Sequence, residues 1–195
     1  MPDSSNLSFL LQLLESPDLI SRLTLSTPYG LVIELDSNGP IAVRLSSSST
    51  PTTQPKSPGY RYHIEPDYQT SFLWYDTNWP GNPDDQYNVE EQVLEERYSA
   101  AFCRAWDAWV DRYTRGFEAN ECHHGSGAEP FPDRNERLAW ELEGLLLATW
   151  LALQSDVDRV TLQDYELKKE YAIEKAGVGE TVERFWKDLK ERYQL

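Results

Sequence analysis

The spacing of apolar residues changes near Tyr87, and this change constrains the fold more than any other feature of the sequence. Before Tyr87 the chain has short β-rich runs separated by turn residues. Among these are Asn38 and Gly39, a pair that accepts positive φ and suits a hairpin. The expected strands cover residues 31–35, 41–45, 60–64 and 72–75. They predict a small antiparallel sheet of about four hairpin-connected strands near the N-terminus.

After Tyr87 the apolar residues recur at helical spacing to the end of the chain. Some of these segments begin with an N-cap residue and have an acidic residue three positions later, as in a capping box. The cap pairs are Asn88 with Glu91, Asp133 with Glu136, and Thr161 with Asp164. The pattern predicts helices over residues 88–115, 134–154, 161–176 and 180–193.

These elements predict an α+β fold, in which a four-helix C-terminal half packs on the antiparallel sheet. A chain of 195 residues is most simply one domain, here 1–195. Within it, residues 1–86 would hold an N-terminal helix and the sheet, and residues 87–195 the helical part. Segment 46–58 is nearly all Ser, Thr and Pro, so we expect a mobile loop, either an inert insertion or a site of modification.

The charge balance narrows the possible partners. The chain has 18 Lys and Arg against 33 Asp and Glu, a formal net charge of −15. Because contacts with phosphates need clustered Lys and Arg side chains, this net charge argues against direct nucleic-acid binding and against binding to an anionic membrane surface. No apolar run approaches the roughly 20 residues that span a bilayer, and the residues after Met1 lack the basic region of a secretory signal. With only Cys103 and Cys122, no disulfide framework is expected, which favours the cytoplasm or nucleus.

Residues 62–96 contain no Lys or Arg, but they contain nine acids and seven large aromatic side chains. The aromatic residues of the predicted strands can face a core, and acids in the first turns of a helix are favoured by the helix dipole. These effects leave residues 76–85 unexplained, an acidic segment with Trp79 in its middle. Trp79 either anchors a binding partner, since Trp is frequent in interface hot spots, or covers an edge of the core.

We therefore predict a regulatory binding module that docks a basic protein through this acidic aromatic loop. An inhibitor, an immunity-like protein or a chaperone-like protein would have such a surface, because complementary charge speeds association. The residues expected to contact the partner are Trp79, Asp76, Asp84, Asp85 and Trp74. A structural subunit, whose acidity confers only solubility, is an alternative.

A metal-binding protein or metal-dependent enzyme is the other alternative. Segment 76–85 carries several oxygen ligands in the frame of a calcium loop, although its prolines and Tyr87 do not fit an EF-hand. Cys122, His123 and His124 offer the thiolate and imidazole groups that zinc prefers, without the usual spacing of chelating pairs. We expect no cofactor beyond such a Zn or Ca ion. No oxyanion site accompanies Cys122, so no catalytic residues are predicted and an enzyme is less favoured than a binding protein.

Overall fold

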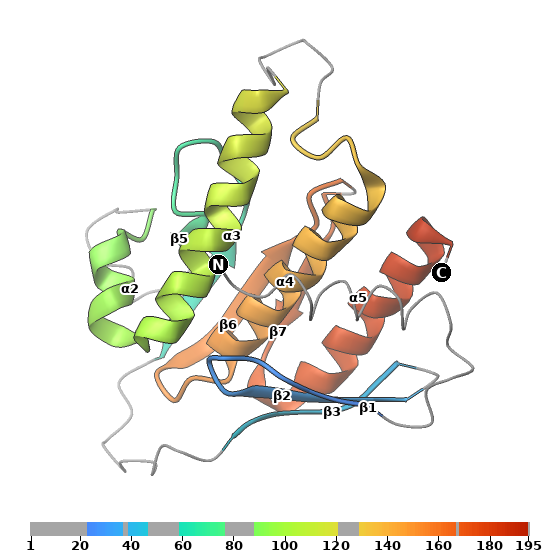
Figure 1. Cartoon of the computed structure of the whole chain (residues 1–195). Helices are drawn as coiled ribbons and strands as arrows, with labels where there is room; N and C mark the ends of the chain where they lie inside the picture. Colours follow the sequence, from blue (N-terminus) through green and yellow to red (C-terminus); the bar gives the residue numbers. More distant parts are fainter. Residues whose placement is uncertain are drawn as a thin grey trace.

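The computed structural model describes residues 23–36, 39–46, 59–76, 88–120, 129–166 and 168–194. In chain order the elements are β1 (Leu23–Ser26), β2 (Leu31–Asp36), β3 (Gly39–Leu45), β4 (Tyr60–Ile64), β5 (Leu73–Tyr75), α2 (Glu91–Arg97), α3 (Ala100–Ala119), α4 (Arg134–Ala152), β6 (Val157–Gln163), β7 (Glu170–Ile173), a 3₁₀ turn η2 (Lys175–Gly177) and α5 (Val178–Tyr193) (Figure 1). The α+β class is confirmed. The expected N-terminal helix and nearly all of the Ser/Thr/Pro-rich segment lie outside the described residues.

The strands form two sheets instead of one. The first sheet has the antiparallel order β1-β2-β3, and its central strand buries Leu31 and Ile33. The predicted hairpin of β2 and β3 is therefore confirmed. β4 and β5 also pair antiparallel, as expected, but they belong to a second sheet with the order β5-β4-β6-β7.

The second sheet corrects the predicted helix over residues 161–176, because β6 and β7 occupy that part of the chain. β6 pairs parallel with β4, with Tyr62 opposite Val160, and antiparallel with β7. Instead of capping a helix, the Asp164 carboxylate accepts a hydrogen bond from the backbone N–H of Glu166, at 3.0 Å, in the turn between the two strands. Pairing with a distant strand outweighs the local helix propensity of this segment.

The predicted helix over residues 88–115 is divided into α2 and α3. Tyr98 and Ser99 have extended backbones, and the Ser99 hydroxyl accepts a hydrogen bond from the backbone N–H of Phe102 at the start of α3. Asn88 does not cap α2, since its side-chain amide instead donates to the carbonyl of Leu73 at 3.3 Å. The break occurs because Ser99 supplies its own N-cap and Tyr98 turns into the core, where it is 8% exposed.

α3 and α4 pack through a reciprocal tryptophan pair. The Trp109 indole N–H donates to the Trp140 carbonyl at 2.9 Å, and the Trp140 indole N–H donates to the Trp109 carbonyl at 3.0 Å. Their rings stack with centroids 4.9 Å apart. α4 begins as predicted, with the Asp133 side chain accepting from the backbone N–H of Glu136. Most of α4 is buried, so this helix forms the centre of the fold.

One hydrophobic core joins both sheets to the helices. In Figure 1, α4 lies between α3 and α5, and the first sheet closes the lower end of the molecule. α5 contacts β3 and β7, so it connects the two sheets. The indole N–H of Trp150 on α4 donates to the carbonyl of Tyr29, at 2.6 Å, in the turn between β1 and β2. Within the described ranges, no helix is both long enough and apolar enough to traverse a bilayer.

Candidate functional site

The structure describes only part of the predicted site. The predicted partner or metal contacts outside the described residues are Trp79, Asp84, Asp85, Cys122, His123 and His124. Asp76 and Trp74 are described. Trp74 is half-buried in β5, and its indole N–H donates to the carbonyl of Glu65 at 3.2 Å. The partner-binding role of this loop and the zinc and calcium sites therefore stay predictions.

Both ends of segment 77–87 are fixed at one edge of the second sheet. Before the segment, the Asp76 backbone N–H donates to the carbonyl of Arg61 at 2.9 Å. After it, Asn88 forms a β-bridge with Trp74, and the Val89 N–H donates to the carbonyl of Leu73 at 2.8 Å. The chain thus leaves and returns beside β5, immediately before α2. In the sequence, this acidic segment is followed closely by the acids of that helix.

Four exposed acids on α2 and α3 form a single acidic surface. Its members are Glu91 and Glu95 on α2, and Asp107 and Asp111 on α3. Partial burial raises the pKa of Asp107, and the negative charges of the other three raise it further. Among the described residues, no Lys, Arg or His lies within ion-pair distance of these carboxylates. Arg104 and Arg115 lie one turn from Asp107 and Asp111 on α3, and Arg115 donates to the Asp111 carbonyl, so the acidic surface has a net negative charge but no close ion pair within the described ranges.

Two arginines of these helices, Arg97 and Arg112, contact other elements, whereas Arg104 and Arg115 are exposed on α3. The Arg97 guanidinium lies over the Tyr60 ring, 3.8 Å from its centroid, and donates to the Tyr62 hydroxyl at 3.2 Å. The Arg112 guanidinium pairs with Glu143 on α4. Burial raises the pKa of Tyr62 to about 12, so this hydroxyl stays neutral. The Arg97 contacts hold α2 against the second sheet and leave its acids toward solvent.

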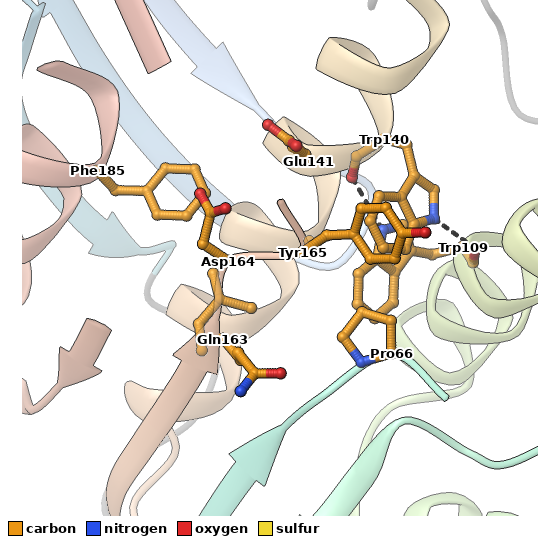
Figure 2. A pocket seen from close by; sticks show the side chains of 10 residues that line it. Pro66, Trp109, Trp140, Glu141, Gln163, Asp164, Tyr165 and Phe185 are labelled. Atoms are coloured by element: carbon orange, nitrogen blue, oxygen red, sulfur yellow. Dashed lines mark hydrogen bonds between the residues drawn. The ribbon is translucent and has the colours of Figure 1, made fainter. Parts of the chain in front are cut away.

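A second cluster of charged residues lies where α4, α5 and the β6–β7 connection meet. The Arg192 guanidinium donates to both Glu141 carboxylate oxygens, at 2.9 and 3.0 Å, and also to Asp164. Glu141 and Asp164 line one side of a small cavity, and the Trp109–Trp140 pair lines the other (Figure 2). The cavity volume is about 10 Å³, enough for about one water molecule. The cavity is therefore too small for a substrate.

Metal ligands do not gather in the described part of the chain. Among those residues, no group of three or more His, Cys, Asp or Glu side chains is arranged to hold a metal ion. Cys103 is buried in α3 at 6% exposure, where it packs as a small apolar residue. Comparisons of the chain with protein-family models, curated proteins and solved structures found no match.

Two parts of these clusters were not predicted from the sequence. Asp107 and Asp111 join the α2 acids only because α3 packs beside α2. Their spacing was a usable signal, since like charges four residues apart on a helix destabilise it unless something offsets them. Arg192 and its acidic partners come from three separate elements, so no local pattern indicated them.

Proposed function

We propose that this protein is a regulatory binding module that docks a basic protein partner through its acidic surface and the adjoining segment 77–87. The observation that carries the proposal is the convergence of Glu91, Glu95, Asp107 and Asp111, which form no close ion pair with any base among the described residues. Such convergence costs stability through like-charge repulsion. A basic partner would offset that cost and gain a complementary surface.

The two parts of this interface would act differently. Exposed carboxylates attract a basic protein over long range and raise the association rate, an effect that salt screens. Trp79, in the segment whose two flanking residues are fixed beside β5, would supply the apolar anchor that charge alone does not provide. A partner that itself binds nucleic acid fits this chemistry, because its phosphate-binding surface is basic. A cytoplasmic or nuclear location belongs to the same proposal.

Charge reversal tests the proposal directly. The purified chain serves as bait in a native lysate at low and high salt, and the captured proteins are identified by mass spectrometry. We expect basic proteins that are lost at high salt, and lost at low salt from a Glu95→Lys/Asp107→Lys variant. The Glu180→Lys/Glu183→Lys variant is the matched control, since it changes the net charge equally on exposed positions of α5.

The control should retain the captured proteins, and all variants should show the same far-UV circular dichroism as the wild type. Equal loss from both reversed variants would mean that total charge governs binding, which contradicts a defined acidic surface. The absence of any salt-sensitive basic protein would contradict the proposal as a whole. In that case the acidity would serve solubility alone.

A further inference from the structure

The last turn of α5 is held by one guanidinium that faces three carboxylates. Arg192 donates to Glu141 on α4 and to Asp164 after β6, and its Nη1 lies 3.5 Å from Glu166 Oε2 in the β6–β7 connection. These contacts join three elements that are separated in the sequence. A second contact ties α5 to β7 nearby, where the Tyr171 hydroxyl donates to Asp188 at 2.5 Å and Lys169 pairs with the same carboxylate.

The charges in this cluster do not balance. The side chains of Glu141 and Asp164 are 3% and 1% exposed, and Arg192, at 13%, is the base that both share. Glu166 is 44% exposed and also faces Arg137, which pairs with Glu129 at 3.1 Å. If both buried acids were ionised, one negative charge would stand uncompensated where water is largely excluded. Burial of such a charge is costly, and a carboxylate in this position takes up a proton instead.

We propose that this cluster is a proton-operated latch, in which protonated Glu141 lets the last turn of α5 dock on α4 and the β6–β7 connection, and loss of the proton loosens that turn. In the protonated state Glu141 still accepts hydrogen bonds from Arg192, while Asp164 neutralises the guanidinium. In the ionised state the two carboxylates compete for one cation. The latch is independent of the proposed binding function and stands whether or not a basic partner exists.

Each element around Glu141 contributes to its titration. Burial raises the pKa of Glu141 to about 7; Arg192 and Arg137 lower it, whereas Asp164 and Glu166 raise it. On α5, the neighbouring Tyr193 is 4% exposed, and its buried hydroxyl has no hydrogen-bond partner among the described residues. Burial and the charge of Glu141 raise the pKa of Tyr193, so this residue stays neutral and does not titrate with Glu141.

The direction of the pH effect follows from the raised pKa. The docked state binds the proton more tightly than an opened state in which Glu141 has its ordinary pKa of 4.5. The stabilising effect of the proton is therefore fully present below pH 4.5, decreases as the pH rises, and is lost above about pH 7. Docking of α5 should weaken as the solution passes from mildly acidic to mildly alkaline.

Amide hydrogen exchange in the last turn of α5, residues 189–194, measures this docking. The Glu141→Gln variant keeps the hydrogen-bonding oxygen but cannot ionise. Comparing it with the wild type at each pH therefore cancels the pH dependence of the intrinsic exchange rate. From about pH 5.5 to about pH 8.5, wild-type protection should fall roughly thirtyfold relative to Glu141→Gln. The Glu143→Gln variant, on the same helix but paired with Arg112, is the matched control and should follow the wild type.

A second measurement keeps the test valid if the Glu141→Gln variant does not fold. The side-chain carboxyl carbon of Glu141 can be followed by NMR in the wild-type protein as the pH changes. A midpoint near pH 7 supports the latch. A midpoint near 4.5, or equal pH dependence of α5 protection in wild type and Glu141→Gln, overturns it. Neither measurement uses a binding partner, so its failure leaves the proposed function untouched.

Discussion

At Gly144 the helix α4 carries no side chain, and the ring of Trp109 occupies the space beside it. A Cβ atom added at Gly144 would lie 2.7 Å from Cζ2 and 3.1 Å from Cε2 of Trp109. That ring cannot easily shift, because its indole N–H is bound to the Trp140 carbonyl and its face stacks on the Trp140 ring. The close approach of the two helices therefore depends on one missing methyl group.

We expect Gly144→Ala to destabilise the protein. Overpacking of a filled core costs about 1–3 kcal/mol, which exceeds the gain of up to about 1 kcal/mol in helix propensity. The free energy of unfolding, measured by urea denaturation, should fall by about 1 kcal/mol or more. Gly179→Ala is the control, since no atom lies within 4 Å of its added Cβ, and it should be neutral or slightly stabilising. Equal stability of the two variants would refute the packing argument.

Ser99 separates two helices that the apolar pattern predicts as one. Its hydroxyl accepts from the N–H of Phe102 at 3.3 Å, and the turn it creates directs Tyr98 onto the Tyr62 hydroxyl at 3.1 Å. A continuous helix would carry Tyr98 away from that partner. The angle between α2 and α3, and with it the shape of the acidic surface, depends on this cap.

Loss of the cap should therefore lower the stability of α3 and the free energy of unfolding of the whole protein. Ser99→Ala removes the acceptor for the Phe102 N–H, and N-cap changes of this kind cost about 0.5–2 kcal/mol. Thermal and urea unfolding should show the loss, and Ser99→Asp, which keeps an acceptor, should restore most of it. If Ser99→Ala unfolds like the wild type, the backbone break must be imposed by packing of Tyr98 alone.

Local signals predicted several elements whose cause is local, although the Ser99 cap was missed, and they failed where a distant partner decides. The hairpin of β2 and β3 and the Asp133 cap of α4 follow from neighbouring residues, and both are confirmed. The end of β6 and all of β7 were predicted as a helix because Thr161 and Asp164 have the spacing of a capping box. β6 forms a strand because it pairs with β4, which lies in the other half of the chain. The same distinction holds for the candidate site. The α2 acids are evident in the sequence, whereas Asp107 lies beside them only because α3 packs against α2.

The molecule as a whole carries far more acids than bases, with a formal charge of −15. Dissolved ions screen the repulsion between the exposed carboxylates of the acidic surface, with a screening length of about 10 Å at moderate salt. They screen the buried Arg192 contacts much less. Added sodium chloride should therefore stabilise the fold. We expect a gain of about 1 kcal/mol, which corresponds to roughly 2–4 °C in the melting temperature of a chain of this size.

The salt effect can be assigned to the acidic surface by calorimetry of a Glu95→Gln/Asp107→Gln variant. This variant should melt higher than the wild type at low salt and respond less to added salt, since part of the repulsion is already gone. A Glu180→Gln/Glu183→Gln variant on α5 should respond like the wild type. A melting temperature that falls with salt would show that surface attractions outweigh repulsions.

The parallel pair of β4 and β6 has a consequence for how the chain is made. Tyr60 pairs with Val157, so about half of the chain is synthesised between the two strands. At about 5–20 residues per second, a newly made β4 waits on the order of 5–20 s on the ribosome with one edge open. Open edges of aromatic strands pair readily with other chains. Chaperones that shield nascent polypeptides are therefore as relevant to the yield of this protein as its final stability.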